Sequence, residues 1–253
     1  MAYQATGLLY YASLEADIHT CQSRFGKKIL LSIGGATSNL ILHSDAHAIS
    51  FANTLWAFFG PPGFISNGLR PFGQAVIDGF DLDKNDGQPG FFGTFATALR
   101  ANFAADLTKD YFLSAAPQCV YLDPSVPQAY LSQCNFVWPQ FFNNPACEVG
   151  SIGLVDSVFQ WSRTVGDSIV SMRDSSAFRT RLLIGIPGCL QAAPITFLRF
   201  GGVRGVQLLA TQLRQLIGLV NLGGLMIWDG PQGLENIQDG LSILGWAKRG
   251  LRG

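Results

Sequence analysis

Charged residues are scarce in this sequence of 253 residues. Asp, Glu, Lys and Arg together make up 13% of it, and 17 basic residues are balanced by 17 acidic ones. The basic residues form no block, so the sequence lacks the electrostatic footprint with which proteins bind nucleic acid or an anionic membrane. We therefore predict no nucleic-acid partner and no membrane partner, and uncharged ligands fit this composition better.

Long apolar runs and clusters of metal ligands are also missing. Residues 178–186 form one of the longest apolar runs, but Arg179 and Arg181 break it, and it falls short of the roughly 20 residues that a membrane-spanning helix needs. No Cys-x-x-Cys pair or histidine cluster is present. His43 and His47 are four residues apart, which favours an exposed helix face, because a metal site would need further ligands. We expect no metal and no cofactor.

Strand and helix patterns alternate along the chain, which is typical of parallel strands joined by helices. The 48% hydrophobic content suffices for one large core, so residues 1–253 are expected to form one domain. The final strand is nearly all apolar, as strands buried between helices are. The patterns predict strands at 28–32, 75–83, 111–116, 136–142, 181–187 and 222–228, and helices at 44–59, 93–106, 126–132, 153–172 and 205–218.

The most informative stretch is residues 76–85, which contains closely spaced carboxylates within a buried strand. Side chains two positions apart on a strand face the same way. Asp81, Asp83 and Asn85 therefore point to one side of the sheet, and the residues between them point to the other. Three polar groups are thus predicted to share one space.

This run, D-G-F-D-L-D-x-N, resembles the signature of glycoside hydrolase family 18, in which a catalytic Glu stands where this sequence has Asn85. The family includes plant and fungal class III chitinases. Other stretches resemble family motifs in the same order: 28–36, the S-x-G-G strand; 114–119, the fifth strand; 140–145, Q-F-Y-N-N; and 223–229, the eighth strand, which ends in a Trp. The resemblance implies a TIM-barrel (β/α)8 fold, an α/β architecture whose active site lies at the carboxyl ends of the strands.

By this alignment the first two βα units are absent, and about six remain. Residues 1–6 do not show the basic start, apolar stretch and cleavage site of a secretory signal. Two hypotheses follow: the sequence is a fragment or a mis-started reading frame of a secreted protein, or it is a truncation that folds by some compensation. The resemblance implies a secreted, extracellular protein, although this chain carries no signal peptide.

The resemblance also implies roles for the polar cluster. Family 18 enzymes use the N-acetyl carbonyl of the substrate as the nucleophile. Asp83 would orient that acetamide and buffer the proton of the acid, and Asp81 would lie one layer deeper and share hydrogen bonds with Asp83. Asn85 has no transferable proton at a useful pKa. Phe142 replaces a Tyr whose hydroxyl bonds the N-acetyl group, so two chemical groups of the reaction are missing.

The other candidate residues follow from the motifs. Trp228 would form the aromatic floor of a sugar subsite, whereas Asp78 is expected to be a buried structural carboxylate. The tryptophans at 56, 161 and 246 fall on helical faces and are predicted to pack in the core. The full set of predicted substrate-binding residues is Gly35, Gln140, Asn143, Met226, Trp228 and Asp229.

Five cysteines allow two interpretations from the residues alone: two bridges and an odd thiol in a secreted barrel, or buried small apolar groups in the cytosol. The family resemblance implies that Cys119 pairs with Cys147. Cys21, Cys134 and Cys189 are then left without obvious partners.

The leading hypothesis is a monomeric, chitinase-like protein that binds chitin or N-acetylglucosamine oligomers with hydrolysis lost or strongly reduced. It could act as a secreted effector that sequesters chitin fragments. One alternative is an endochitinase that uses Asp86 as its acid, although Asp86 would point to the opposite face of a continuing strand. Further alternatives are an interaction protein that inhibits another glycosidase, and the remnant of a non-functional gene.

Overall fold

A six-stranded parallel sheet forms the centre of the computed structural model, which describes residues 2–3, 9–63, 70–172, 176–199, 202–216 and 221–252. The spatial order is β10-β9-β6-β5-β4-β3, and every neighbouring pair is parallel, as the alternating pattern predicted. Within the described residues, β3 and β10 are the edge strands. The strands are β3 (Leu30–Gly34), β4 (Gly79–Asp83), β5 (Phe112–Ala115), β6 (Phe136–Val137), β9 (Arg181–Pro187) and β10 (Leu222–Trp228).

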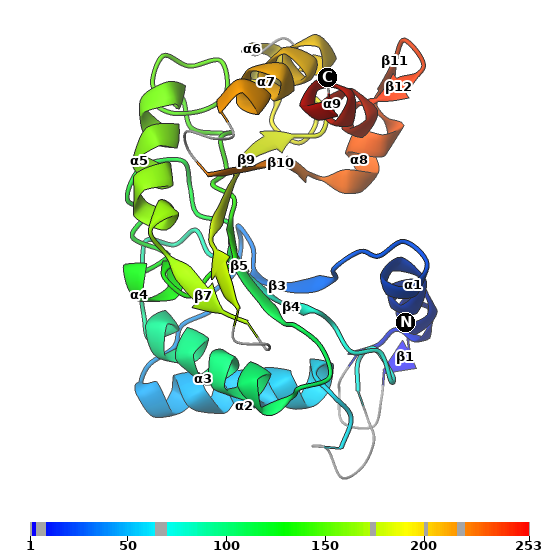
Figure 1. The fold of residues 1–253 in the computed structure, drawn as a ribbon, viewed down its shortest axis with the longest axis vertical. Helices are drawn as coiled ribbons and strands as arrows, with labels where there is room; N and C mark the ends of the chain where they lie inside the picture. The colour runs from blue at the N-terminus through cyan, green and yellow to red at the C-terminus, as the bar shows by residue number, and fades with distance from the viewer. Residues whose placement is uncertain are drawn as a thin grey trace.

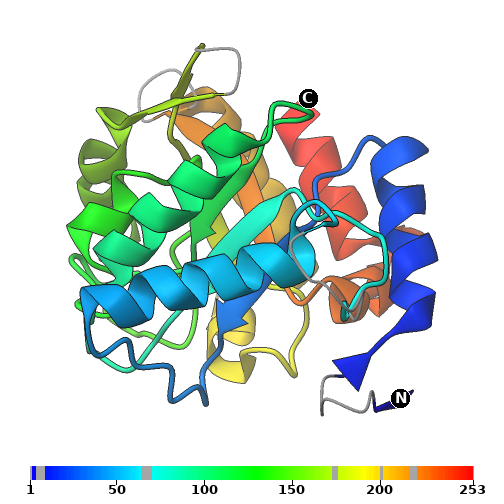
Figure 2. The same cartoon turned by 90° about the horizontal axis from the view of Figure 1, so that it is seen from below.

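Helices connect successive strands and cover the outer side of the sheet (Figure 1). Figure 2 shows the two helices that follow β3 and β4, α2 and α3, running side by side. The side chain of Ser44 caps α2 by accepting a hydrogen bond from the His47 N–H, which explains why the helix begins there. The helices on the sheet are α2 (Asp45–Phe59), α3 (Phe92–Ala105), α4 (Gln128–Leu131), α5 (Leu154–Gly166) and α7 (Gly202–Leu216).

The alternation predicted for β4 is present. Phe80, Leu82 and Lys84 are buried on the side of the sheet that carries the helices, whereas Asp81 and Asp83 form hydrogen bonds on the inner side. Trp56 and Trp161 are buried in the core, and Trp246 is partly buried against it, as their helical positions predicted. Side-chain alternation along β4 therefore separates the apolar core from the inner polar cluster.

Asp78 precedes β4 and is a buried structural carboxylate, as expected. It accepts hydrogen bonds from the backbone N–H of Ile29 and from Gln22, both at 2.8 Å, and from the ammonium group of Lys109 at 3.1 Å. These contacts join the start of β3, the start of β5 and the helix α1 (Ala12–Ser23) at the amino ends of the strands.

One predicted helix was too long. Residues 153–172 do not form a single helix: α5 ends at Gly166, and β7 (Ile169–Ser171) pairs antiparallel with β8 (Ala177–Arg179). Gly166 is a weak helix former and the β-branched Ile169 and Val170 favour an extended backbone, so local propensity outweighed the apolar period.

Several short elements carried no clear sequence signal. They are α1, α6 (Pro194–Arg199), α8 (Gly230–Glu235), α9 (Ile243–Arg252) and the two-residue strands β1 (Ala2–Tyr3), β2 (Leu9–Tyr10), β11 (Ile237–Gln238) and β12 (Leu241–Ser242). In the described part of the chain, none of the helices combines the length and the apolar character needed to cross a membrane.

Glycine allows β3 to lie against the end of β4. A Cβ atom on Gly34 would lie 2.0 Å from the carbonyl oxygen of Asp83, and the φ angle of Gly34 is +109°. Both facts exclude any other residue here without a shift of the backbone. The next residue, Gly35, donates its N–H to the same Asp83 oxygen at 2.6 Å, which fixes the backbone that carries Asp83.

Candidate functional site

Polar side chains gather at the carboxyl ends of the central strands. Asp83 is the last residue of β4, Gln118 follows β5 and Gln140 follows β6. Isolated parallel bridges join Gln118 to Gln140 and Gln140 to Gly185 of β9, so the backbone keeps these positions adjacent beyond the ends of the regular strands. Residues that are distant in sequence are thus brought to one edge of the sheet, where α/β barrels build their sites.

The centre of this cluster is the Asp83 carboxylate. Its Oδ1 accepts a hydrogen bond from Asn85 Nδ2 at 2.8 Å and another from Gln140 Nε2 at 2.9 Å. Burial raises the pKa of Asp83, and the two amide donors act in the opposite direction because they stabilise its charged form. The predicted proximity of Asp83, Asn85 and Gln140 is therefore present in the structure.

Gln118 belongs to the same network, although the sequence motifs assign it no role. Its Nε2 donates to Asn85 Oδ1 at 2.6 Å and lies 3.4 Å from Gln140 Oε1. The Asn85 amide therefore has a partner at each end: its nitrogen donates to Asp83 and its oxygen accepts from Gln118. The position of Gln118 at the end of a predicted strand, beside the strand that carries Asp83, was the available signal.

Asp81 lies deeper on the same strand and has its own partners. It accepts hydrogen bonds from Ser32 Oγ at 2.8 Å and Ser114 Oγ at 2.7 Å, on the strands to either side. The expectation that Asp81 shares hydrogen bonds with Asp83 is wrong, because the serine hydroxyls on the neighbouring strands occupy both oxygens of Asp81. Burial raises the pKa of Asp81 to about 6, against the effect of these hydroxyls.

Asp86 lies on the other side of the strand extension. Its carboxylate contacts the ammonium group of Lys84, which is buried and also lies 5.4 Å from the centre of the Phe92 ring. Burial acts to raise the pKa of Asp86, but the hydrogen bond from Lys84, the backbone N–H of Gln88 and the Lys84 charge lower it below its ordinary value. Asp86 is therefore ionised at neutral pH and directed away from Asp83.

An aromatic pair lies beside the polar cluster. The rings of Phe142 and Trp228 are stacked, with centroids 5.7 Å apart and an interplanar angle of 9°. Phe142 is buried, whereas Trp228 at the end of β10 is 48% exposed. The pair therefore offers an apolar surface to solvent and, at Phe142, no hydroxyl donor.

The other predicted binding residues lie at the same edge of the sheet but differ in exposure and in contacts. Met226 lies against Gly185 on β9, where a Cβ would come within 2.8 Å of its terminal methyl. Asp229 caps α8 by accepting from the Gln232 N–H at 2.8 Å. Asn143 is exposed, has a positive φ of 57° and donates its N–H to Thr196. Met226 and Trp228 line this edge of β10, and Asp229 has a structural contact of its own.

A disulfide bond joins Cys119 to Cys147, the pair that the family resemblance implied. The carbonyl oxygen of Cys119 accepts hydrogen bonds from Ser157 Oγ and Trp161 Nε1 of α5. These hydrogen bonds hold Cys119, the residue after Gln118, against α5, and the disulfide ties it to the loop that carries Cys147. Cys21, Cys134 and Cys189 carry free thiols.

The described residues contain no group of three or more His, Cys, Asp or Glu side chains arranged to hold a metal ion. His43 and His47 are both exposed and their rings stack at 5.6 Å. The chemistry of the polar cluster is therefore that of one carboxylate pair and three amides.

The chain resembles known proteins in sequence and, among solved structures, in fold. An endochitinase of Saccharomyces cerevisiae is 36% identical over 235 residues, which cover 92% of this chain but 38% of the relative, so the chain spans less than half of that protein. Among solved structures, a xylanase-A-amylase inhibitor protein (XAIP-III) matches with a TM-score of 0.69 and 30% identity, covering 86% of this chain and 74% of the inhibitor.

A second solved structure, the ICChI chitinase from Ipomoea carnea, also matches with a TM-score of 0.69 and 30% identity, over 85% of this chain and 73% of the chitinase. The model of one protein family matches residues 11–186, which include Asp81, Asp83 and Gln140. The parallel sheet, the order of the motifs and this match agree, and the chain belongs to glycosyl hydrolases family 18.

Proposed function

We propose that the protein binds N-acetylglucosamine oligomers at the carboxyl edge of its sheet and does not hydrolyse them. The observation that carries the proposal is the bonding of Asn85. Its amide occupies the position of the family's acid, donates to Asp83 and accepts from Gln118. A carboxamide in this network has no proton to transfer to a glycosidic oxygen.

The lost acid matters because cleavage needs a proton on the leaving oxygen. General acid catalysis contributes on the order of 10²–10⁴ in rate. The ring of Phe142 keeps the stacking contact with Trp228 but lacks the hydroxyl that would bond the acetamide. Two groups of the family's reaction are therefore missing from one site, while Asp83 and Gln140 remain hydrogen-bonded in it.

Sugar binding is supported by what remains. Pyranose rings present apolar C–H faces that pack on aromatic rings, and the half-exposed Trp228 offers such a surface beside the polar groups of Asp83 and Gln140. The similarity to an endochitinase and to a chitinase favours chitin oligomers over other sugars.

Asp86 gives little support to the alternative of an atypical endochitinase. It contacts Lys84 on the far side of the strand, and its lowered pKa keeps it ionised near neutral pH. A general acid should instead hold its proton near the working pH and reach the substrate. On this argument the role of Asp86 is structural.

We further propose that the protein acts outside the cell, as a monomer that sequesters chitin fragments. The Cys119–Cys147 disulfide supports an oxidising compartment, because such bonds persist mainly in secreted proteins.

The direct test is calorimetric titration with a chitin hexamer, followed by chromatography of the same sample for shorter oligomers. We expect saturable binding and an unchanged hexamer. Absence of binding in a correctly folded preparation would refute the sugar-binding proposal. Release of chitobiose would refute the loss of hydrolysis, and the substitution Asp86→Ala would then show whether Asp86 is the acid.

A second candidate is inhibition of another glycosidase by protein contact. The observation that favours it is the similarity, at 30% identity, to a protein named as a xylanase-A-amylase inhibitor. The two candidates differ in a simple assay. Inhibition of a xylanase or an amylase by a preparation that does not bind the chitin hexamer supports the second, and hexamer binding without inhibition supports the first.

A further inference from the structure

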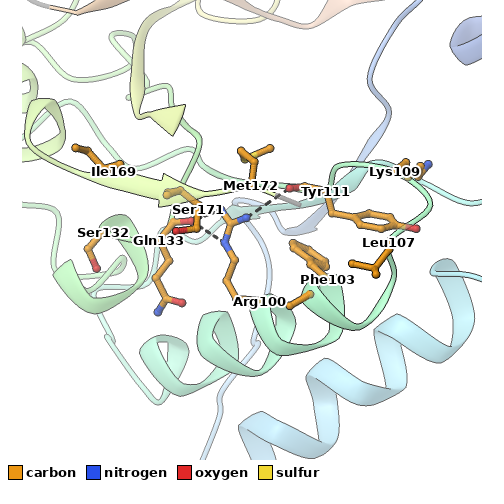
Figure 3. A pocket seen from close by; sticks show the side chains of 12 residues that line it. Arg100, Phe103, Leu107, Lys109, Tyr111, Ser132, Gln133, Ile169, Ser171 and Met172 are labelled. Carbon is orange, nitrogen blue, oxygen red and sulfur yellow. Dashed lines mark hydrogen bonds between the residues drawn. The ribbon is translucent and has the colours of Figure 1, made fainter. Parts of the chain in front are cut away.

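Figure 3 shows the residues that line a cavity of about 480 Å³. The strand positions place this cavity at the opposite end of the sheet from the proposed sugar site. Tyr111 and Gln133 line it, and these residues precede β5 and β6, whereas Gln118 and Gln140 follow those strands. The end of α3 and the strand β7 supply the rest of the wall. A ligand in this cavity would not overlap the polar cluster around Asp83.

Arg100 is the central cation of the cavity. Figure 3 shows its side chain rising from α3 into the middle of the lining residues. Its hydrogen bonds go to neutral oxygens: the carbonyl of Gln133, Asn135 Oδ1 at 2.6 Å, and the carbonyl of Tyr111 at 3.4 Å. In the described ranges no carboxylate forms a salt bridge with Arg100.

The lack of a carboxylate partner among the described residues makes the charge of Arg100 energetically unfavourable. Burial lowers the pKa of Arg100 to about 10, so the guanidinium stays protonated at neutral pH while much of its hydration is lost. Arg100 is partly buried, and a charge that loses hydration without gaining an opposite charge is costly, so a bound anion would offset part of that cost. The Nη1 atom has one long contact of 3.4 Å, which leaves donor capacity on this nitrogen.

The other cation of the lining, Lys109, already has a carboxylate. It donates to Asp78 at 3.1 Å, and Asp106 is occupied by the Tyr111 hydroxyl at 2.5 Å. Arg100 is therefore the group that distinguishes an anion from a neutral ligand in this cavity.

Six of the twelve lining residues are apolar, and Ser132, Gln133 and Ser171 add neutral polar groups to the wall. Phe103 and Met172 line the interior, and Leu107 and Ile169, which are 69% and 58% exposed, lie toward solvent. One guanidinium without a salt bridge in the described part of the chain, next to the apolar side chains of Phe103 and Ile169, suits a monoanion with a hydrocarbon body. Inorganic phosphate carries about two negative charges, which one guanidinium does not balance. It also has no apolar part to contact the apolar side chains of the cavity.

We propose that this cavity binds small amphiphilic carboxylates, with the carboxylate on Arg100 and the hydrocarbon part against Phe103 and Ile169. The site is separate from the proposed sugar site, so the two proposals can fail independently.

The test is calorimetric titration of the whole chain with octanoate, 1-octanol and inorganic phosphate. Octanoate is expected to bind at least about tenfold more tightly than the neutral alcohol, which corresponds to about 1.4 kcal/mol, and phosphate is expected not to bind. Equal affinities for octanoate and octanol would overturn the role of Arg100. Competition between octanoate and the chitin hexamer would place the ligand at the other end of the sheet and overturn the proposal.

A pair of matched variants tests the location. Ile169→Glu puts a negative charge in the cavity at an exposed position, where folding tolerates it, and is expected to weaken octanoate binding about tenfold or more. Ile152→Glu adds the same charge at a fully exposed residue before α5 and is expected to leave binding unchanged. Equal effects of the two variants would reduce the result to net charge and contradict the proposed site.

Discussion

The phenyl ring of Phe142 lies 5.7 Å behind the indole of Trp228 and nearly parallel to it, at 9°. Because Phe142 is 5% exposed and Trp228 is 48% exposed, the buried ring supports the indole while the indole keeps free surface. An offset stack of this kind contributes about 0.5–1.5 kcal/mol beyond burial of area. Phe142 therefore orients the aromatic surface on which a sugar would pack, even though it lacks the hydroxyl of the Tyr that it replaces.

The first prediction concerns this surface. Trp228→Ala is expected to weaken binding of the chitin hexamer by about tenfold or more, since it removes the stacking face. Trp228→Phe should retain part of the affinity because it retains a ring. Leu234→Ala, at a 57% exposed residue of α8, is the control and should bind as the parent does. If Trp228→Ala binds the hexamer normally, the aromatic floor lies elsewhere.

The second prediction restores the missing chemistry. Asn85→Glu combined with Phe142→Tyr should make the protein hydrolyse chitin oligomers, with a gain on the order of 10²–10⁴ over the parent from the acid alone. Gln118 is placed to hydrogen-bond the new carboxyl group, since it donates to Asn85 Oδ1 at 2.6 Å. Chromatography of released chitobiose is the measurement.

A shape-matched variant separates the proton from the fit of the side chain. Asn85→Gln combined with Phe142→Tyr has the length of the Glu variant but no acidic proton, and it should stay inactive. Should both double variants fold, bind sugar and remain inactive, the acid position is not the reason for the loss of hydrolysis. Hydrolysis would then have been lost through other changes in the site, and the proposal that the missing acid explains the loss would be refuted.

Much of the sheet could be predicted because strand patterns are local. The bounds of β9 and β10 agree with the predicted ranges, and the alternation in β4 placed Asp81 and Asp83 on the inner side. The predicted strand 136–142 is shorter, with β6 ending at Val137, since Pro139 has no N–H to continue the ladder.

The sequence patterns could not predict which side chains from distant segments contact one another. Asp81 bonds to Ser32 and Ser114, which are 49 and 33 residues away, and no spacing rule links such positions. The same holds for Gln118 and for the cavity around Arg100, whose lining comes from separate segments of the chain. The family motifs located the strand ends, but the partners of each side chain follow only from the register of the sheet.

The third prediction concerns the disulfide. Cys119 and Cys147 are separated by 28 residues, and in the chain-entropy model closing a loop of this size lowers the entropy of the unfolded state, which stabilises the folded state by about 3–4 kcal/mol. The double variant Cys119→Ser and Cys147→Ser should therefore lose stability of that order in urea unfolding. Cys21→Ser, at a half-buried free thiol, is the control and should change stability little. Equal losses in both variants would contradict a role of the bond.

The fourth prediction concerns the buried carboxylate of Asp81. Burial raises its pKa from 3.8 to about 6 in the folded protein, whereas the unfolded chain keeps an ordinary value. Below pH 4 both states hold the proton, and Asp81 contributes no pH dependence. Between pH 4 and 6 the folded state binds more protons than the unfolded state, so stability falls as pH rises. Above pH 6 the full cost, on the order of 3 kcal/mol, is present.

Replacement by asparagine removes this titration while an amide can still meet the hydroxyls of Ser32 and Ser114. The stability of Asp81→Asn relative to the parent should therefore increase from pH 4 to pH 6 and then level off, whatever its value at pH 4. Urea unfolding at several pH values measures the difference, and Asp17→Asn on the exposed side of α1 controls for the loss of one negative charge. A difference that stays constant with pH would mean that Asp81 is ionised in the folded protein at little cost, and the serine hydroxyls would then offset its burial in full.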